Sequence, residues 1–130
     1  MTTELHFLVY CVILGLVHLV AASHFISHQY GYRWTASNRE EIMPPLKGMA
    51  GGVDRATINF LETFPFFAAV VLIAHLVGCH GTLTILGAHL YFWGRIFYLG
   101  ASTAGFPLVR SLSWNIPTSG ILLFVIALLS

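Results

Sequence analysis

The side chains that could do chemistry begin with three polar residues, Arg55, Asn59 and Glu62, set in a hydrophobic stretch. On a helix, their spacing of i, i+4 and i+7 places them within about 60° of one another, so they form one stripe. A cation, an amide and an anion on one face of a membrane-bound helix are costly to keep in hydrocarbon. Ionisable groups inside a membrane usually face a bundle interior or a cavity. The stripe therefore predicts a functional polar site.

The composition places this stripe in a membrane protein. The chain has 130 residues, of which 57% are hydrophobic and 8% are charged, and its mean hydropathy is +0.80. A soluble domain carries about 25% charged residues, so this chain could not cover its surface with polar groups. The length fits one domain with about four spans of roughly 20 residues each. A net charge of +1 without a basic cluster argues against binding to nucleic acid.

We expect an all-α, integral membrane four-helix bundle. A polar connection rich in Pro and Gly follows the first span, and the turn at 79–81 is short enough to make the second and third spans an antiparallel hairpin. Asp54 is expected at the start of the second helix. The first span follows a segment without Lys or Arg, which predicts a retained helix and not a signal peptide. The four spans are predicted at about 5–28, 54–78, 82–104 and 111–130.

Charge placement predicts the orientation in the membrane. All six Lys and Arg residues lie in, or point toward, the connection between the first two spans and the connection between the last two. The two termini and the 79–81 turn carry none. The positive-inside rule therefore places both connections in the cytoplasm and both termini on the opposite side.

Arg95 interrupts the third span at a depth that matches Glu62. With a rise of 1.5 Å per residue, both lie roughly 12–14 Å below the cytoplasmic ends of two antiparallel helices. An ion pair between them, within one subunit or across an interface, would explain how both are tolerated in hydrocarbon. Tyr98 and Ser102 extend the Arg95 face at i+3 and i+7, and Arg110 closes the row. Together with the stripe, these side chains predict a pocket that opens to the cytoplasmic leaflet.

Structural alternatives remain open at this point. The arginines at the mouth of the pocket could extend to the membrane interface without binding anything, and the Glu62–Arg95 pair could serve only to fix the helix register. Among the seven histidines, His24 and His28 share the i, i+4 spacing of a ligand pair but have no carboxylate or third ligand beside them. We therefore expect no metal site.

These residues resemble the signature of a known membrane family. The run Arg55-x-x-x-Asn59-x-x-Glu62-x-x-Pro65 is similar to that of the MAPEG family, the membrane-associated proteins in eicosanoid and glutathione metabolism. The chain length, the four spans, the polar first loop, the short second turn, Gly94-Arg95-x-x-Tyr98 and the later Arg110 agree with it. The resemblance covers nearly the whole chain and is greatest with the bacterial members.

The resemblance implies a homotrimer in the bacterial inner membrane, surrounded by lipids, with glutathione as co-substrate bound between protomers near the cytoplasmic side. It also implies an enzyme of the transferase or peroxidase type, which uses the glutathione thiol against lipophilic electrophiles or lipid hydroperoxides. By position, Arg110 would stabilise the thiolate as the catalytic residue. The residues that would bind glutathione are Arg55, Asn59, Glu62, Arg95 and Tyr98.

Two positions depart from the family pattern. Thr63 stands where glutathione-using members commonly carry a tyrosine directly after the motif glutamate, and Ser102 stands where they often carry another tyrosine. Both changes remove donors or stacking surface expected around the tripeptide. They favour the alternative, a non-enzymatic membrane protein of the same fold in which the intramembrane polar residues hold the bundle and the trimer together.

Overall fold

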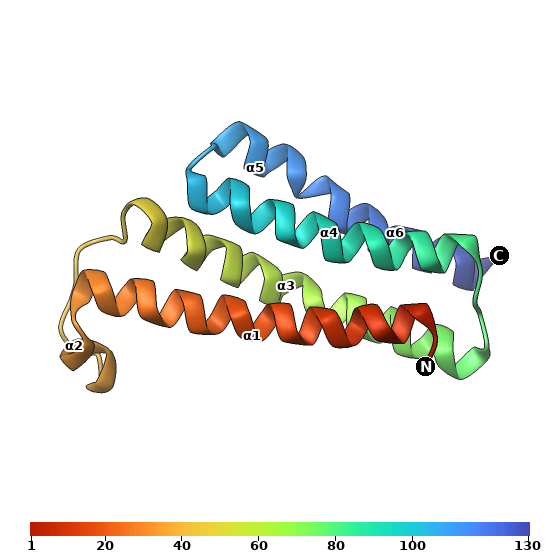
Figure 1. The fold of residues 1–130 in the computed structure, drawn as a ribbon, viewed down its shortest axis with the longest axis horizontal. Helices are drawn as coiled ribbons and strands as arrows, with labels where there is room; N and C mark the ends of the chain where they lie inside the picture. Colours follow the sequence, from red (N-terminus) through yellow and green to blue (C-terminus); the bar gives the residue numbers. More distant parts are fainter.

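The chain folds into an elongated bundle of helices (Figure 1). The computed structural model describes residues 1–130, except for the side chain of Pro107. No strand occurs among the described residues, which confirms the all-α class. The elements are, in chain order, α1 (Thr3–Tyr30), α2 (Tyr32–Ala36), α3 (Gly48–Val77), α4 (Thr82–Ala104), α5 (Pro107–Ser113) and α6 (Asn115–Leu129).

Three segments are long and apolar enough to cross a membrane. Many large apolar side chains on them are exposed, for example Leu16 at 57% and Leu122 at 56%. Water would drive such a surface to associate, whereas lipid chains solvate it. Helix α4 is not among the three, so its crossing of the membrane, and with it the count of four spans, stays a prediction. The three segments are Thr3–Tyr30, Gly48–Val77 and Leu108–Leu129, the last of which runs through α5 and α6.

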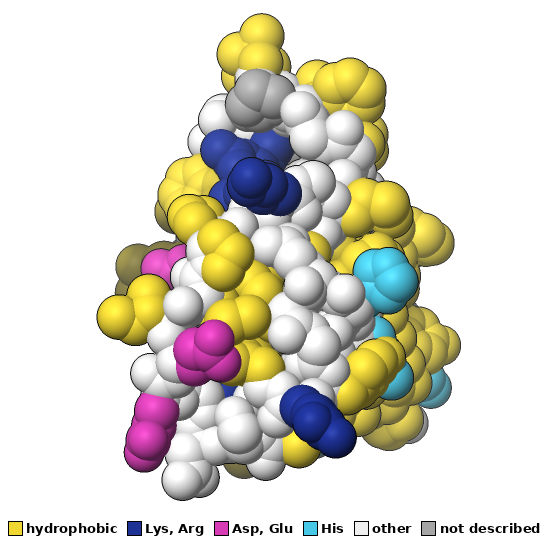
Figure 2. Space-filling model, turned by 90° about the vertical axis from the view of Figure 1, so that its left-hand side faces the viewer, with side chains coloured by type: hydrophobic (Ala, Val, Ile, Leu, Met, Phe, Trp, Pro, Cys, Tyr) yellow, Lys and Arg dark blue, Asp and Glu magenta, His cyan; other side chains and the backbone are white. Residues whose placement is uncertain are grey.

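The two ends of the bundle differ in what they carry. Both termini and the short turn between α3 and α4 lie at one end, whereas α2 and the connection between α4 and α5 lie at the other (Figure 1). Figure 2 looks onto this second end and shows Lys and Arg side chains there, with acidic side chains near them. The fold thus brings the two basic connections to the same end, while the side of the membrane that this end faces remains a prediction.

Hydrogen bonds order the connection between α1 and α3. Gln29 donates from Nε2 to the Pro45 carbonyl at 3.1 Å, and its Oε1 accepts from the backbone N–H of Lys47 at 3.0 Å. Trp34, on α2, donates from Nε1 to the Glu41 carbonyl at 3.1 Å. These side chains hold the returning chain against the end of α1 and lead it into α3.

Helix α3 begins at Gly48 and not at Asp54, the start that the sequence suggested. Its early glycines indicate a helix breaker in isolation, but α4 packs against the backbone at one of them, Gly52. A Cβ on Gly52 would lie 2.1 Å from the backbone oxygen of Ser102. The Ser102 hydroxyl donates to the Gly52 carbonyl at 2.7 Å. The tertiary contact thus offsets the low helix propensity of glycine.

The span expected at 111–130 is interrupted near Trp114. Helix α5 ends at Ser113 and α6 begins at Asn115. Pro117 has no N–H to donate to the Ser113 carbonyl, so the regular helical hydrogen-bond pattern is interrupted here.

Aromatic rings form much of the core between α3, α4 and α6. Phe67 stacks on Tyr91 with ring centroids 4.1 Å apart, and Phe124 meets Phe67 edge-on at 6.0 Å. All three rings are fully buried. Such ring pairs contribute about 0.5–1.5 kcal/mol each beyond the area they bury. The cluster fixes α3, which carries the polar stripe, relative to α4 and α6.

Helices α4 and α6 approach closely through two glycines. A Cβ on Gly87 would lie 2.6 Å from the backbone oxygen of Gly120, and a Cβ on Gly120 would lie 2.5 Å from that of Gly87. Since both neighbouring atoms belong to helical backbone, an added methyl group could be accommodated only if the helices separated.

We expect Gly87→Ala to destabilise the bundle by about 1–3 kcal/mol, because it overpacks this crossing. The measurement is the midpoint of thermal unfolding in detergent. Gly100→Ala is the matched control, since Gly100 lies in the same helix and a Cβ there would have no neighbouring atom within 4 Å. Alanine is the better helix former, so the control should keep or raise the midpoint. Equal midpoints for the two variants would contradict the close crossing.

At the end that holds the termini, a buried carboxylate ties α1 to the α3–α4 turn. Glu4 is 2% exposed, lies 2.5 Å from His80 Nδ1 and accepts from Thr84 Oγ1 at 3.3 Å. With His80 protonated, this is the one ion pair among the described side chains. Glu4 therefore has a structural role at the opposite end from the basic connections.

Candidate functional site

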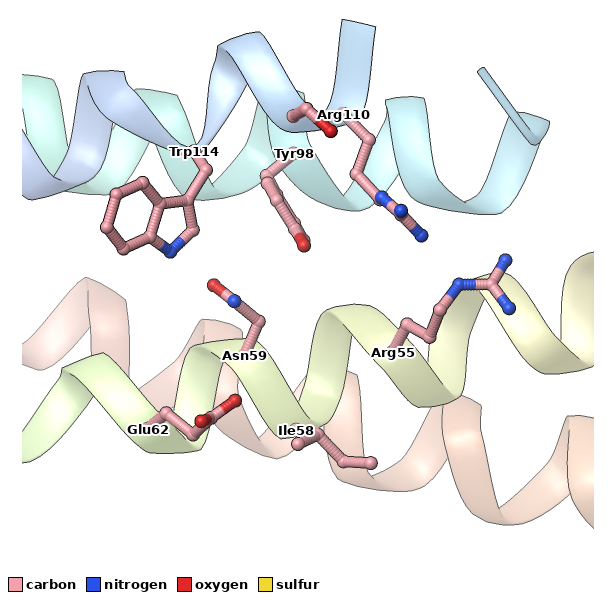
Figure 3. A pocket seen from close by; sticks show the side chains of 8 residues that line it. Arg55, Ile58, Asn59, Glu62, Tyr98, Arg110 and Trp114 are labelled. Carbon is pink, nitrogen blue, oxygen red and sulfur yellow. The ribbon is translucent and has the colours of Figure 1, made fainter. Parts of the chain in front are cut away.

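A cavity of about 480 Å³ opens between α3 and the α5–α6 segment. Figure 3 shows the guanidinium groups of Arg55 and Arg110 at one end of it, and Glu62 with the Trp114 ring at the other. The Asn59 amide points from α3 into the space between them. The structure thus gathers most of the residues that the sequence assigned to a polar pocket. The lining comprises Arg55, Ile58, Asn59, Glu62, Tyr98, Arg110, Ser111 and Trp114.

Two further cavities share walls with this one. A space of about 210 Å³ is lined by Arg55 and Arg110 together with Ser102, Gly105 and Phe106. On the other side, a space of about 550 Å³ shares Asn59, Glu62 and Trp114 and adds Thr63, Phe66, Thr118 and Ile121. We call these three neighbouring spaces, with their shared walls, the α3 groove. The groove changes in character along its length, from two guanidinium groups at one end to mainly apolar walls at the other.

The charges in the α3 groove form no ion pair with the side chains that the structure describes. Arg55, Glu62 and Arg110 form no ion pair with any described side chain. The Oδ1 atom of Asn59 is buried, and among the described residues it has no hydrogen-bond donor. Buried polar atoms are normally paired, so an unpaired acceptor beside a cavity points to a donor on a bound molecule. The groove therefore offers two cationic groups, one anionic group and one free acceptor.

Arg95 does not line the groove. Its side chain is 0% exposed and donates from Nη2 to Thr63 Oγ1 at 2.8 Å. The guanidinium lies over the rings of Tyr91 and Tyr98, 5.7 and 5.1 Å from their centroids. The ion pair expected between Arg95 and Glu62 is therefore not formed within the chain.

Glu62 and Arg95 do not pair because their side chains point in different directions, and not because they differ in depth. Successive residues of a helix point about 100° apart, so the Thr63 hydroxyl turns toward Arg95 and Tyr91 while Glu62 turns into the groove, and Thr63 also lines part of the groove wall. Arg95 approaches α3 on the Thr63 side. Tyr98 lies between the two environments, because its ring covers Arg95 and its edge lines the cavity.

Sequence reasoning missed one large wall residue. Trp114 lines two of the three cavities, although a tryptophan near a helix end is most simply an interface aromatic. Its spacing of i+4 from Arg110 places both on one helix face and could have indicated it. Ser102 does line the cationic end, as the row of polar residues suggested, but its hydroxyl is committed to the Gly52 carbonyl.

With this geometry in place, the comparison with protein families is decisive. The model of the MAPEG family matches residues 7–130. The chain belongs to the MAPEG family. Every residue of the α3 groove lies within the matched region of this MAPEG chain, so the resemblance noted from the Arg55–Pro65 run is confirmed over nearly the whole chain. Comparison with curated proteins and with solved structures gives no match.

Proposed function

We propose that this protein is a glutathione-dependent membrane enzyme of the transferase or peroxidase type, which acts on lipophilic electrophiles or lipid hydroperoxides. The observation that carries the proposal is the set of unpaired groups in the α3 groove: Arg55, Arg110, Glu62 and the Asn59 amide. Membership of the MAPEG family is consistent with a function related to glutathione in a membrane.

Glutathione complements these groups in charge and number. It has two carboxylates, one ammonium group and a thiol, and a site for it needs both cationic and anionic partners. Two arginines and one glutamate supply them, and Asn59 Oδ1 is free to accept from a peptide N–H. Such charge-assisted hydrogen bonds are shorter and stronger than neutral ones.

In this proposal Arg110 stabilises the thiolate. The thiolate, not the thiol, is the nucleophile, and a neighbouring guanidinium favours it. Arg110 is half-buried at the wall shared by the polar cavity and the cationic cavity. With an electrophile, the sulfur forms a thioether and a leaving group departs. With a hydroperoxide, two glutathione molecules give the disulfide while the hydroperoxide becomes an alcohol and water.

The apolar end of the groove supports a lipophilic second substrate. Phe66, Trp114 and Ile121 line it directly beside Glu62, and the outer faces of the helices carry exposed apolar side chains. A lipophilic molecule could thus enter this end of the groove from the bilayer without crossing water. The homotrimer, the inner-membrane location and the cytoplasmic position of the basic end belong to the same proposal. The gathering of the basic connections at one end supports that orientation.

The proposal is tested by turnover of the purified protein in detergent. Glutathione is offered with 1-chloro-2,4-dinitrobenzene, which reports thioether formation, and with cumene hydroperoxide, which reports peroxidase activity. We expect saturable activity with at least one of them. Rates no higher than those of the uncatalysed reactions would contradict an enzyme of either type.

One observation favours a structural alternative. Thr63, Arg95 and Ser102 are polar residues of the membrane-embedded region that bond to other parts of the same chain. If the groove residues acted in the same way, the protein would be a non-enzymatic member of its family. The exposure of Glu62 and its lack of an ion-pair partner separate it from this group.

A further inference from the structure

A buried cation and an unpaired anion lie close to each other without meeting. Arg95 is fully enclosed in the bundle, and Glu62 is exposed in the α3 groove. Thr63, the residue next to Glu62, accepts the hydrogen bond of Arg95 at 2.8 Å. A carboxylate would be a stronger partner for a guanidinium than a hydroxyl is. Something must therefore hold Arg95 on the inner side of α3.

The Thr63 hydroxyl is well placed to do so. Two nitrogens of Arg95, Nε and Nη1, are buried without a hydrogen-bond partner among the described residues, so Thr63 Oγ1 is the side chain's one acceptor there. The same oxygen lies 3.0 Å from the Tyr91 hydroxyl. The rings of Tyr91 and Tyr98 flank the guanidinium and add cation–π attraction. Loss of the Thr63 hydroxyl would remove this hydrogen bond and leave the cation beside the Tyr91 and Tyr98 side chains.

We propose that Thr63 is a specificity-determining, positioning residue. It holds Arg95 inside the bundle and so leaves Glu62 as an uncompensated carboxylate, which selects ligands with a free ammonium group. The same hydrogen bond keeps the Arg95 guanidinium against the Tyr98 ring and so fixes one wall of the cavity. The part of this proposal that concerns ligand selection rests on the proposed function, since it takes glutathione as the ligand. The part that concerns the position of Arg95 does not depend on any ligand.

The first test compares glutathione with its N-acetyl analogue, which lacks the ammonium group. Calorimetric titration is done on the wild type, Thr63→Val and Thr63→Ser. Valine has nearly the shape of threonine but no hydroxyl, and serine keeps the hydroxyl. We expect the wild type and Thr63→Ser to prefer glutathione by about tenfold or more, the value of one charged hydrogen bond. In Thr63→Val, Arg95 is released toward Glu62 and the preference should fall to within about threefold.

The second test needs no ligand. The five tyrosines are replaced by 3-fluorotyrosine, and the ¹⁹F signal of Tyr98 is assigned by its loss in Tyr98→Phe. Departure of the cation from the ring should shift this signal in Thr63→Val and leave it in place in Thr63→Ser. If Thr63→Val does not assemble, Thr63→Ala takes its place in both tests.

The outcomes separate this inference from the proposed function. A Tyr98 signal that is unmoved by loss of the hydroxyl overturns the inference, whether or not glutathione binds. An unchanged preference for glutathione in Thr63→Val, with wild-type binding intact, overturns the role of Thr63 in ligand selection. If the wild type binds neither ligand, the proposed function fails, and ligand selection by Glu62 fails with it. The ¹⁹F signal of Tyr98 still decides whether Thr63 holds Arg95 in place.

Discussion

Arg110→Ala should abolish the ultraviolet absorbance of the thiolate in bound glutathione and lower turnover about 100- to 1,000-fold. The reason is that Arg110 is the cation placed at the wall between the polar cavity and the cationic cavity, where it can stabilise charge on sulfur. Removal of one such preorganised charge costs about 3–4 kcal/mol in the transition state. The measurement is the thiolate spectrum at saturating glutathione, together with kcat for the better substrate.

Arg55→Ala is the matched control, because Arg55 lines the same two cavities from α3. It is expected to weaken glutathione binding while the bound molecule keeps its thiolate. Arg110→Lys, which retains a positive charge, should recover part of the thiolate signal. An unchanged thiolate spectrum and kcat in Arg110→Ala would assign the stabilising role to another residue.

Glu62→Gln should weaken glutathione binding about 10- to 100-fold, while the oligomer and its thermal unfolding midpoint stay unchanged. Glu62 is exposed and makes no ion pair within the described chain, so its loss leaves no buried charge behind. Loss of the Glu62 carboxylate should therefore affect only ligand binding. The dissociation constant and the unfolding midpoint are measured on the same preparation.

Glu4→Gln supplies the opposite pattern. Glu4 is buried and bonded to His80 and Thr84 at the far end of the bundle, so its amide variant should unfold at a lower temperature and bind glutathione normally. If Glu62→Gln instead behaved like Glu4→Gln, with lost stability or assembly and unchanged affinity, the groove glutamate would be structural. The non-enzymatic alternative would then be favoured.

The polar stripe could be predicted from the sequence because helical spacing alone determines it. Arg55, Asn59 and Glu62 share a face wherever α3 begins, so the early start at Gly48 did not affect their grouping. The start itself could not be predicted. It depends on the contact between Gly52 and Ser102, two residues 50 positions apart in the chain.

The contacts of Arg95 could not be predicted from its depth in the membrane alone. The rise per residue gives the height of a side chain in a membrane, but its direction depends on how two helices are rotated against each other. That rotation is set by packing, including the stacked rings of Phe67 and Tyr91. Arg95 contacts the rings of Tyr91 and Tyr98 and the Thr63 hydroxyl in place of Glu62, the partner expected from the sequence. These contacts could be recognised only in three dimensions.

A calorimetric titration of the detergent-solubilised wild type shows whether the α3 groove binds glutathione. We expect a saturable binding signal at or below millimolar glutathione, accompanied by thiolate absorbance that follows the same curve. A titration that gives neither binding heat nor thiolate absorbance up to millimolar concentration would contradict it.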